Sequence, residues 1–532
     1  MLLILSAATV SEDIASQFGR LPPSFLPLGN RRLFAIQAEL ARGGRCVMTL
    51  PQAFPISDVD RRAIDAAGIE LLIQPPGLRL TEALAQAIRA TQPQGPLSLL
   101  YGDTIVRMDD ALLAQPDMVA VQDTSANYPW AFVETDGNGT LRFSDEPPRR
   151  LDSRRVVCGY YNFSDAALFA EACEERSIVA ALNRYNASRP LTPASAEGWY
   201  DFGHLPLYFQ SKQKIMVKRA FNSLGFEDHL LIKQSDDTQK MRAEAHWYEN
   251  LPSEIRLHVP RYGGRVARDF RAGYGVEYLY HPLLSDVFAF GSLPLATWLE
   301  IISACFEFIG KCQAIRPPEG SPETSPRFAD QFFKSMIIDK SWSRLEAYCA
   351  TGPVSLDDAI TLNGVTHEPL RKVVERVIAR IAPTRPEHVR FWHGDLFFGN
   401  MFYDFTARRV LSIDPRGMIG HGEFSLYGDM RYDLSKLAHS IVGQYDKIVL
   451  GRAQLEQETP LNWRFTIDQQ AHQADLQQIF LNFVNDECGV ETGELLALTA
   501  LLFFSMLPLH SDRPDLQRIF LANGLRLAGE IE

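Results

Sequence analysis

Short apolar runs alternate with amphipathic stretches from residue 1 to about residue 121. The apolar runs occupy 2–7, 46–50, 70–75 and 97–103, and stretches with helical periodicity occupy 33–44, 59–68 and 80–91. Strands and helices that alternate at this pitch predict a parallel sheet with helices on both faces. Ligands of such sheets bind beyond the carboxyl ends of the strands. Residues 6–8 and Asp103, at two predicted strand ends, are therefore candidate binding residues.

The pattern changes after residue 121. The turn sequence Asp-Gly-Asn-Gly at 136–139 predicts a hairpin between two strand-like runs. Asp201 later lies between aromatic residues and Gly203, where an ordinary turn carboxylate and a functional carboxylate both fit the local sequence. The basic stretch 205–219 predicts a helical connector. We place the domain boundary in this connector, which gives domains 1–213 and 214–532.

The second domain begins with a strand-rich part and continues with a helical part. Residues 229–235 form a strand-like run that contains Lys233, and helical periodicity at 240–251 includes Glu244. Amphipathic periodicity at 295–315, 328–349 and 370–382 predicts helices. The sequence thus predicts a small lobe at about 219–280 and a large, mostly helical lobe at about 281–532.

Charge and cysteine content narrow the function classes. A net charge of −12 provides no basic face for nucleic-acid phosphates, so we expect no nucleic-acid partner. The seven cysteines are scattered without a CxxC pair, which favours a reducing compartment. The first apolar run has no basic residue before it, and the apolar run at 495–509 is shorter than a membrane span. We therefore expect a cytoplasmic protein without a membrane span.

Residues 391–417 carry the strongest candidate chemistry. Asp395 follows a His-Gly pair, Asn400 lies five positions later, and Asp414 ends a strand-like run. Phosphoryl transfer needs a carboxylate that orients and deprotonates the attacking hydroxyl, plus an amide and a second carboxylate that hold Mg²⁺ against nucleotide phosphates. Asp395, Asn400 and Asp414 match these roles in that order. A single such aspartate would more commonly cap a buried turn, so the assignment rests on the whole pattern.

Two neighbouring residues have candidate roles in the same stretch. His393 is expected to orient the loop by hydrogen bonding, because Asp395 is better placed to act as the base. Arg416, two residues beyond Asp414, is expected to contact a phosphate or a loop carboxylate.

The string HGDLFFGN followed by SIDPRG resembles the aminoglycoside phosphotransferase and choline kinase family, small-molecule relatives of the protein kinases. The resemblance implies a two-lobed α+β protein-kinase-like domain with a mostly helical C-lobe that uses ATP and Mg²⁺. It implies that Lys233 contacts the α- and β-phosphates and is held by Glu244, with Glu249 as the rival partner. It also implies that backbone groups of the segment from Glu277 to Leu279 bind the adenine edge, and that Asp433 supports the catalytic loop.

The N-terminal half resembles the sugar nucleotidyltransferases, which have a Rossmann-like fold of the GT-A type. The matching segments are ILSAA at 4–8, PPSFLPLGNRRLFAIQ at 22–37, LYGD at 100–103, GYYNF at 159–163 and WYDFGH at 199–204. The resemblance implies that Asp103 and Asp201 hold Mg²⁺. It also implies that the loop with Ala7 and Ala8, together with Arg20, contacts a second nucleoside triphosphate, which is CTP, GTP or UTP.

Two features depart from that family. Residues 6–12 replace a glycine-rich, arginine-containing loop whose backbone amides cradle the triphosphate. Ser24 stands where the family has a lysine. Neutralisation of the phosphate charge then falls to Arg20, or to Arg31 or Arg32 as substitutes.

The two resemblances together predict a bifunctional enzyme that acts on a small molecule. The kinase would phosphorylate a hydroxyl of a sugar or amino alcohol, and the nucleotidyltransferase would convert the product into a nucleotide-activated precursor for surface polysaccharide. The alternative is a small-molecule kinase with a catalytically inactive, scaffold-like N-terminal domain. A pseudoenzyme is disfavoured because Lys233, Asp395, Asn400 and Asp414 are all present. Homo-oligomerisation stays open.

Two acceptor patterns remain open at this point, beside a neutral sugar, which would need only scattered hydrogen-bonding groups. A choline-type cation needs an aromatic cage, and an aminoglycoside needs an acidic trough. The candidates are Trp392, Phe397, Phe398 and Tyr427 for the cage, and Glu423 and Asp429 for the trough.

Overall fold

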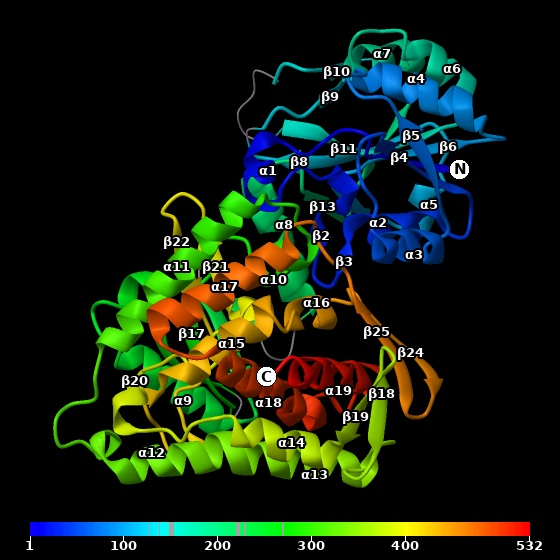
Figure 1. The fold of residues 1–532 in the computed structure, drawn as a ribbon. Helices are drawn as coiled ribbons and strands as arrows, with labels where there is room; N and C mark the ends of the chain where they lie inside the picture. Colours follow the sequence, from blue (N-terminus) through cyan, green and yellow to red (C-terminus); the bar gives the residue numbers. More distant parts are fainter. Residues whose placement is uncertain are drawn as a thin grey trace. The chain divides into compact units, whose positions relative to one another are not determined.

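The chain divides into two compact units, Met1–Lys214 and Ile215–Glu532, in the computed structural model (Figure 1). The structure describes residues 1–126, 128–137, 139–147, 154–219, 224–227, 230–268 and 271–531. The first unit combines a partly parallel sheet with helices, and the second has a small sheet followed by many helices. This confirms the predicted fold class, an α/β domain followed by an α+β domain with a mostly helical large lobe.

A nine-stranded sheet lies at the centre of the first unit. Its parallel part has the order β6-β1-β4-β5, formed by Leu97–Tyr101, Leu2–Leu5, Cys46–Pro51 and Ile69–Gln74. The first three strands are apolar and mostly buried, because helices cover both faces of a parallel sheet. Figure 1 shows α4, α6 and α7 on one face and α2, α3 and α5 on the other. These helices span, in that order, Leu80–Thr91, Ala166–Ala172, Ile178–Ser188, Leu33–Gln37, Asp58–Ala66 and Asp110–Leu113.

Antiparallel strands extend the sheet beyond β6. Strand β11 (Arg154–Phe163) pairs with β6 and with β8 (Met118–Thr124), and β12 (Thr192–Ser195) runs parallel to β8. Strands β9 (Phe132–Thr135) and β10 (Leu141–Ser144) form the predicted hairpin, of whose turn Asn138 lies outside the described residues. The sheet is therefore mixed: its β6-β1-β4-β5 centre has the predicted parallel arrangement, and β8 and β12 form a further parallel pair at the other side of β11.

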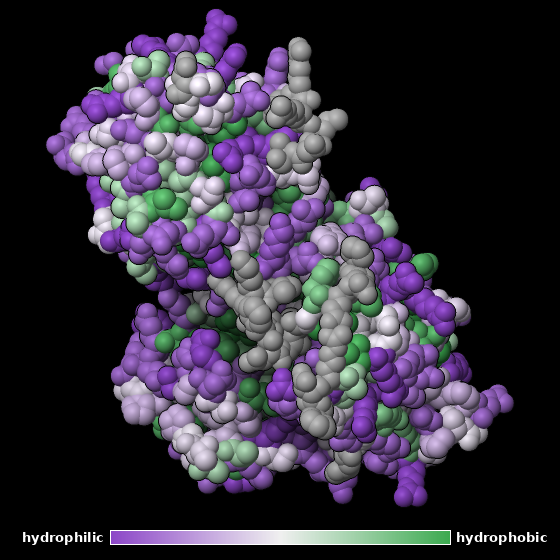
Figure 2. Space-filling model, turned by 180° about the vertical axis from the view of Figure 1, so that it is seen from behind, coloured by the Kyte–Doolittle hydropathy of each residue, from purple (hydrophilic) through white to green (hydrophobic). Residues whose placement is uncertain are grey.

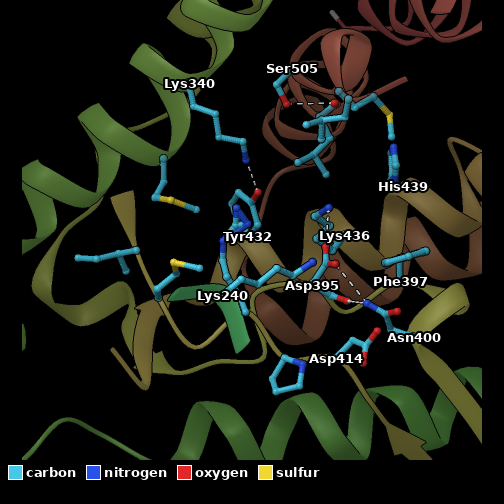
Figure 3. Close-up of a pocket in the computed structure, with 18 of the residues that line it drawn as sticks. Lys240, Lys340, Asp395, Phe397, Asn400, Asp414, Tyr432, Lys436, His439 and Ser505 are labelled. Atoms are coloured by element: carbon cyan, nitrogen blue, oxygen red, sulfur yellow. Dashed lines mark hydrogen bonds and ion pairs between the residues drawn. The ribbon is translucent and has the colours of Figure 1, made fainter. Parts of the chain in front are cut away.

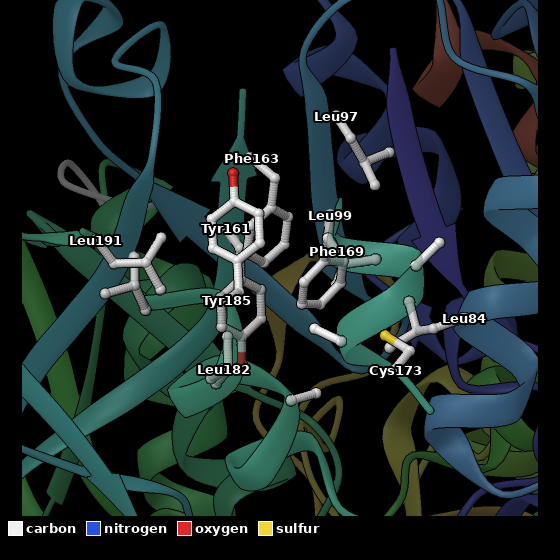
Figure 4. Close-up of a cluster of buried hydrophobic side chains, with 14 of the residues drawn as sticks. Leu84, Leu97, Leu99, Tyr161, Phe163, Phe169, Cys173, Leu182, Tyr185 and Leu191 are labelled. Atoms are coloured by element: carbon white, nitrogen blue, oxygen red, sulfur yellow. The ribbon is translucent and has the colours of Figure 1, made fainter. Parts of the chain in front are cut away.

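Aromatic side chains fill the core between this sheet and its helices (Figure 4). Phe163 of β11 stacks on Phe169 of α6 with ring centroids 3.7 Å apart. Tyr185 of α7 packs edge-on against both rings, at 4.9 Å and 5.8 Å. All three side chains have no exposed surface. Burying one such ring contributes about 2–3 kcal/mol, so this cluster is a main source of stability for the unit.

Replacing Phe169 with alanine is expected to destabilise the first unit by about 3–5 kcal/mol, because it leaves a cavity between two closely packed rings. Hydrogen exchange in strands β6 and β11 should then become faster, while exchange in the helices of the second unit stays unchanged. The matched control is Glu171→Ala on the exposed face of the same helix. Equal exchange rates in the two variants would contradict this assignment of the core.

The small lobe of the second unit is an antiparallel sheet of order β14-β15-β17-β16. Its strands span, in that order, Leu224–Glu227, Leu230–Ser235, Arg271–Glu277 and Tyr262–Arg268. Helix α9 (Thr238–Glu249) packs against β17 and begins at Asp237, whose carboxylate accepts the backbone N–H of Lys240. This cap fixes the start of the helix that carries Glu244.

The large lobe is built mainly from helices. The longer ones are α11, α13, α14, α15, α17, α18 and α19, which span Leu295–Ala314, Lys340–Thr351, Leu370–Ala379, Met430–Ile441, Gln473–Cys488, Thr492–Met506 and Pro514–Gly529. Shorter helices are α10 (Leu284–Phe290), α12 (Pro326–Phe332) and α16 (Tyr445–Val449). Helix α18 packs against α13, α14, α15 and α19, so it forms the centre of the lobe.

The large lobe also contains a sheet that the sequence did not predict. Its order is β19-β18-β25-β24, formed by Val365–Pro369, Ala359–Leu362, Asn462–Ile467 and Ala453–Thr459. Strands β18 and β25 run parallel, although they are far apart in the sequence. Local periodicity does not reveal such a pairing, because each strand is short and its partner is distant.

One helical segment has the length and composition of a membrane span. Thr492–His510 has 19 residues and a mean hydropathy of 1.7, and 67% of this window is buried inside the protein. This helical segment is longer than the apolar run at 495–509, whose length predicts no membrane span. A buried core helix passes the same test, so this single segment is weak support for a membrane span.

Exposed apolar side chains are dispersed over several elements. Figure 2 shows hydrophilic residues over most of the visible face, with hydrophobic residues in small groups. The most exposed large apolar residues are Leu257, Val365 and Leu509, with exposed fractions of 66%, 62% and 62%. Single exposed apolar residues are normal on protein surfaces and indicate no docking face.

Candidate active sites

A cavity of about 630 Å³ in the second unit brings together most of the residues predicted for phosphoryl transfer (Figure 3). Asp395, Asn400, Asp414, Glu244 and Arg416 all line it. These residues come from the catalytic stretch and from helix α9, so the small and large lobes both contribute to the cavity.

The loop that carries Asp395 is held by a buried carboxylate. Asp433 of α15 accepts the backbone N–H groups of His393 and Gly394, each at 2.7 Å. Gly394 has φ +77°, and a Cβ atom there would lie 2.7 Å from the Cβ of Arg416. Only glycine fits this backbone position. The structure thus gives Asp433 the supporting contacts that the sequence resemblance implies.

The side chain of Asp395 is ionised and partly accessible from the cavity. It is 34% exposed and forms an ion pair with Lys436 at 2.8 Å. Asn400 donates to its Oδ2 at 3.2 Å and to its backbone oxygen at 3.0 Å. Burial opposes ionisation of Asp395, yet the nearby Lys436 ammonium holds the pKa of the carboxyl well below its usual range. An ionised carboxylate of this kind can orient a hydroxyl and accept its proton.

Sequence reasoning missed Lys436. It lies on α15, three residues after Asp433, so both side chains face the catalytic loop from the same side of the helix. Its spacing of three residues from Asp433 could have indicated a position beside the catalytic loop. However, a lysine on a helix usually points into solvent, so the spacing alone does not predict this role.

Lys233 connects the small lobe to the catalytic stretch. Its Nζ lies 2.7 Å from Oε2 of Glu244 and 2.9 Å from Oδ1 of Asp414. Glu244 is fully buried and also accepts a hydrogen bond from Tyr274 at 2.6 Å. Burial lowers the pKa of Lys233, but the two carboxylates outweigh this effect and raise it, so the ammonium stays charged. A fixed ammonium at this point can bind nucleotide phosphates.

The rival partner Glu249 has a different role. Its carboxylate pairs with Arg265 at 2.6 Å and accepts a hydrogen bond from Tyr262 at 3.0 Å. Both partners belong to strand β16, so Glu249 fixes α9 to the small-lobe sheet. Of the two candidates, only Glu244 contacts Lys233.

Asn400 and Asp414 fit the ligand set that Mg²⁺ uses with nucleotides. Asp414 follows β22 (Arg409–Ser412) with φ +57°, and the N–H of Ile413 binds the oxygen of Asn400 at 2.9 Å. These contacts hold the two residues side by side. Within the described ranges, no group of three His, Cys, Asp or Glu residues forms an all-protein metal cage. Mg²⁺ commonly takes one or two protein oxygens and completes its shell with water and phosphate.

In the first unit, strand pairing brings Asp103 and Asp201 together. β7 (Thr104–Arg107) follows Asp103 and pairs with β13 (Gly198–Asp201), so that Asp201 lies opposite Thr104. A Cβ atom on Gly203 would lie 2.4 Å from Oδ2 of Asp103 and 3.4 Å from Oδ1 of Asp201. Glycine at this position therefore allows both carboxylates to converge.

The two carboxylates repel each other. Burial and the nearby Asp201 raise the pKa of Asp103 to about 6. Asp201 is held in place by the indole N–H of Trp130 and the backbone N–H of Gly203, each at 2.7 Å. A divalent cation between the two carboxylates would remove the repulsion. The donor set thus fits the Mg²⁺ site that the sequence resemblance implies.

The predicted phosphate loop lies beside this pair. The Ser11 hydroxyl, in the loop that contains Ala7 and Ala8, donates to the backbone oxygen of Gly203 at 3.0 Å. Arg20 is 76% exposed and pairs with Glu12 at 3.3 Å. The structure therefore places the loop near the carboxylates and leaves Arg20 on the surface.

The substitute cations have different partners. Arg32 is 7% exposed and binds the carboxylate of Asp60 at 2.9 Å, and Arg31 pairs with Glu39 on the surface at 3.2 Å. Ser24 is buried and connects two strand ends. Its N–H donates to the hydroxyl of Ser6 at 3.0 Å, and its own hydroxyl donates to the backbone oxygen of Gly102 at 3.2 Å. Arg32 is thus already paired with a buried carboxylate, and its substitute role at the phosphates stays a prediction.

A known protein family matches part of the second unit. Residues 299–465 match the model of the family described as APH, phosphotransferase enzyme family. The C-terminal unit contains an APH phosphotransferase domain. Asp395, Asn400 and Asp414 lie inside the matched segment, and Lys233 and Glu244 precede it. The kinase-like reading of the cavity and the family match therefore agree.

Solved structures resemble 40% of the chain only weakly. They include an inositol-1-phosphate CTP transferase from T. maritima, at 10% identity, 95% coverage of that chain and a TM-score of 0.30. A 4-diphosphocytidyl-2C-methyl-D-erythritol synthase from Anaerococcus prevotii has 10% identity, 95% coverage of that chain and a TM-score of 0.28. A mannose-1-phosphate geranyltransferase from Thermus thermophilus has 15% identity, 78% coverage of that chain and a TM-score of 0.25. These scores are too low to carry an argument. No curated protein matches the chain.

In the phosphotransferase domain, the predicted hinge residues lie away from the cavity. Glu277 ends β17, and its N–H binds the oxygen of Arg261 at 2.9 Å. Leu279 lies between β17 and α10. Neither belongs to the described residues that line the 630 Å³ cavity, so the adenine assignment stays a prediction.

The two acceptor patterns do not form in this cavity. Phe397 is the one predicted cage residue among the described lining residues. Trp392 is fully buried against Phe332 and Tyr432, which makes it a core residue. Asp429 is buried in an ion pair with Arg431 at 2.6 Å and so contributes no acidic trough. The same lining residues do not include Phe398, Tyr427 or Glu423.

His393 makes the stability of the phosphotransferase domain sensitive to acid. Its side chain is fully buried, and burial lowers its pKa from 6.5 to about 4. Because the unfolded chain takes up this proton more readily, the contribution of neutral His393 is complete above pH 6.5 and is lost as the pH falls towards 4. We expect His393→Gln to reduce the loss of unfolding free energy between pH 7 and pH 4 by about 3 kcal/mol. Urea denaturation across this range measures the difference, and parallel curves for variant and wild type would contradict it.

Proposed function

We propose that the protein phosphorylates a hydroxyl group of a small acceptor with ATP, and then couples the new phosphate to a nucleoside monophosphate. The observation that carries the first activity is the contact of Lys233 with Glu244 and Asp414, two carboxylates that line one cavity together with Asp395 and Asn400. Burying charged groups costs free energy even when they are paired, so packing of the core does not account for this arrangement.

The proposed kinase step is an in-line phosphoryl transfer. Asp395 orients the acceptor hydroxyl and takes its proton while the oxygen bonds to the γ-phosphorus of ATP. The bond from the γ-phosphorus to the bridging oxygen breaks, and ADP leaves. Lys233, held by Glu244, binds the α- and β-phosphates. Mg²⁺ held by Asn400 and Asp414 would neutralise charge on the phosphates.

The proposed second step takes place in the first unit. An oxygen of the phosphomonoester attacks the α-phosphorus of CTP, GTP or UTP, and pyrophosphate leaves. Asp103 and Asp201 would hold the Mg²⁺ that neutralises the triphosphate, and their convergence on Gly203 supports this step. The product is a nucleotide-activated sugar or amino alcohol, which we place in cytoplasmic precursor synthesis for a surface polysaccharide.

A second candidate function is a kinase with an inactive N-terminal scaffold. Two observations favour this alternative. Arg32 is already paired with Asp60, and the buried residue 24 is a serine, so neither position offers an unpaired buried cation for the charge of a triphosphate.

Phosphorus NMR of the purified full chain tests the proposal. The protein is incubated with Mg²⁺, ATP, one of CTP, GTP or UTP, and a panel of sugars and amino alcohols. We expect ADP, a new phosphomonoester, and a pyrophosphate-linked diester with one of the three nucleotides. Phosphomonoester without diester would support the scaffold alternative. The absence of phosphomonoester with every acceptor would contradict the kinase assignment.

A further inference from the structure

Three cationic side chains line the phosphotransferase cavity without a carboxylate partner among the described residues. They are Lys340, Arg344 and Arg416. Lys340 and Arg344 lie one turn apart on α13 and therefore share a helix face. Lys340 donates to the hydroxyl of Tyr432 at 2.5 Å, and Arg344 donates to the backbone oxygen of Ser505 at 3.1 Å. We refer to these three residues as the basic cluster.

The carboxylates of the same cavity do not compensate this charge. Glu244 and Asp414 are paired with Lys233, and Asp395 is paired with Lys436. Asp237 caps helix α9. The carboxylates that line the described part of the cavity thus have their own partners, and the acidic group in contact with Lys340 is the phenol of Tyr432.

Nearby titratable groups respond to the positive charge of the basic cluster. Burial lowers the pKa of Lys340 to about 8, and repulsion by Arg416 acts in the same direction. Burial would raise the pKa of Tyr432, but Lys340, Arg416 and Lys436 lower it to about 7. The cluster is therefore held together against repulsion, as expected for a site whose anion is supplied by a ligand.

The geometry points to the basic cluster as the binding site for an anionic group on the acceptor, a carboxylate or a phosphate, while the acceptor hydroxyl faces Asp395. This inference rests on the proposed phosphoryl transfer. Arginine side chains bind both anions through paired N–H groups, and a buried lysine adds a point charge. A cationic acceptor of the choline or aminoglycoside type would be repelled, so this inference narrows the acceptors proposed above from sugars and amino alcohols to alcohols, such as sugars, that carry an acidic group.

The phosphates of ATP have other binding groups. Lys233 belongs to the small-lobe strand β15 and lies 2.9 Å from Asp414, which lines the cavity together with Asn400, the other predicted Mg²⁺ ligand. Lys340 and Tyr432 belong to the large-lobe helices α13 and α15. In the view of Figure 3, Asp395 lies between the Lys340–Tyr432 pair and the Asn400–Asp414 pair. The acceptor and the nucleotide would thus approach Asp395 from different sides.

The inference is tested by anion binding to the full chain saturated with Mg²⁺ and a non-hydrolysable ATP analogue, which fills the γ-phosphate position. Inorganic phosphate, acetate and choline are titrated separately by calorimetry. We expect phosphate or acetate to bind and choline not to bind, and the preferred anion identifies the acceptor group. In Lys340→Gln and Arg344→Gln the anion should bind about tenfold or more weakly, with affinity for the analogue unchanged.

Lys334→Gln is the matched control, because Lys334 is exposed and lies one helical segment before α13. Its anion affinity should equal that of the wild type. Choline binding, no anion binding, or equal affinity in all variants would overturn the inference, as would a loss of affinity for the ATP analogue in the Lys340 and Arg344 variants. Failure of the wild type to bind the analogue would instead contradict the proposed phosphotransferase activity.

Discussion

Replacing Asp395 with asparagine is expected to lower kcat for acceptor phosphorylation about 10³-fold, within the range found for loss of a positioned base. The carboxylate is ionised because Lys436 lies 2.8 Å away, and asparagine keeps the shape of the side chain while removing its ability to take a proton. Lys233, Glu244 and Asp414 are untouched by this change. Affinity for ATP should therefore stay close to the wild-type value.

Steady-state release of ADP measures the rate, and calorimetry with a non-hydrolysable ATP analogue measures binding. Asp330→Asn, on the exposed side of α12 in the same lobe, is the matched control and should have wild-type kinetics. If Asp395→Asn retained more than about a tenth of the wild-type kcat, the carboxylate would not be the base of the reaction.

Replacing Asp103 with asparagine should produce two opposite effects. Without divalent cations, the first unit should become more stable by about 1–3 kcal/mol, because the substitution removes a carboxylate whose burial and repulsion by Asp201 raise its pKa to about 6. At the same time, transfer of the nucleoside monophosphate should be lost, because one of two cation ligands is missing. Phosphomonoester formation in the other unit should continue at the wild-type rate.

Thermal unfolding in EDTA and phosphorus NMR of the products measure the two effects. Asp65→Asn, on the exposed face of α3, serves as the control for a lost carboxylate. A stabilised variant with full nucleotidyl transfer would show that the pair is not a catalytic cation site. A destabilised variant would show that the two carboxylates do not repel each other in the folded protein.

The sequence predicts the features that depend on local order. The parallel centre of the first sheet follows from alternating strands and helices, and the catalytic stretch places Asp395, Asn400 and Asp414 at fixed spacing around one loop and one strand end. The resemblance to the phosphotransferase family added Lys233, which the structure joins to Glu244 and Asp414.

Features that depend on distant partners were not predictable in the same way. Arg32 forms a buried ion pair with Asp60, yet nothing in the local sequence indicates this partner. Lys340 and Tyr432 are far apart in the chain and meet because α13 and α15 both pack against α18. The local sequence allows Trp392 to belong to an aromatic cage, but tertiary packing places this residue in the core.

The most direct test of the coupled activities follows one phosphorus atom through both steps. ATP labelled with ¹⁸O in its γ-phosphate is incubated with the protein, Mg²⁺, unlabelled CTP, GTP or UTP, and the acceptor found by NMR. We expect the label to appear first in a phosphomonoester and then in the acceptor-side phosphate of a pyrophosphate-linked diester. Label that stops in the phosphomonoester, or a diester without label, would contradict the claim that the second site uses the product of the first.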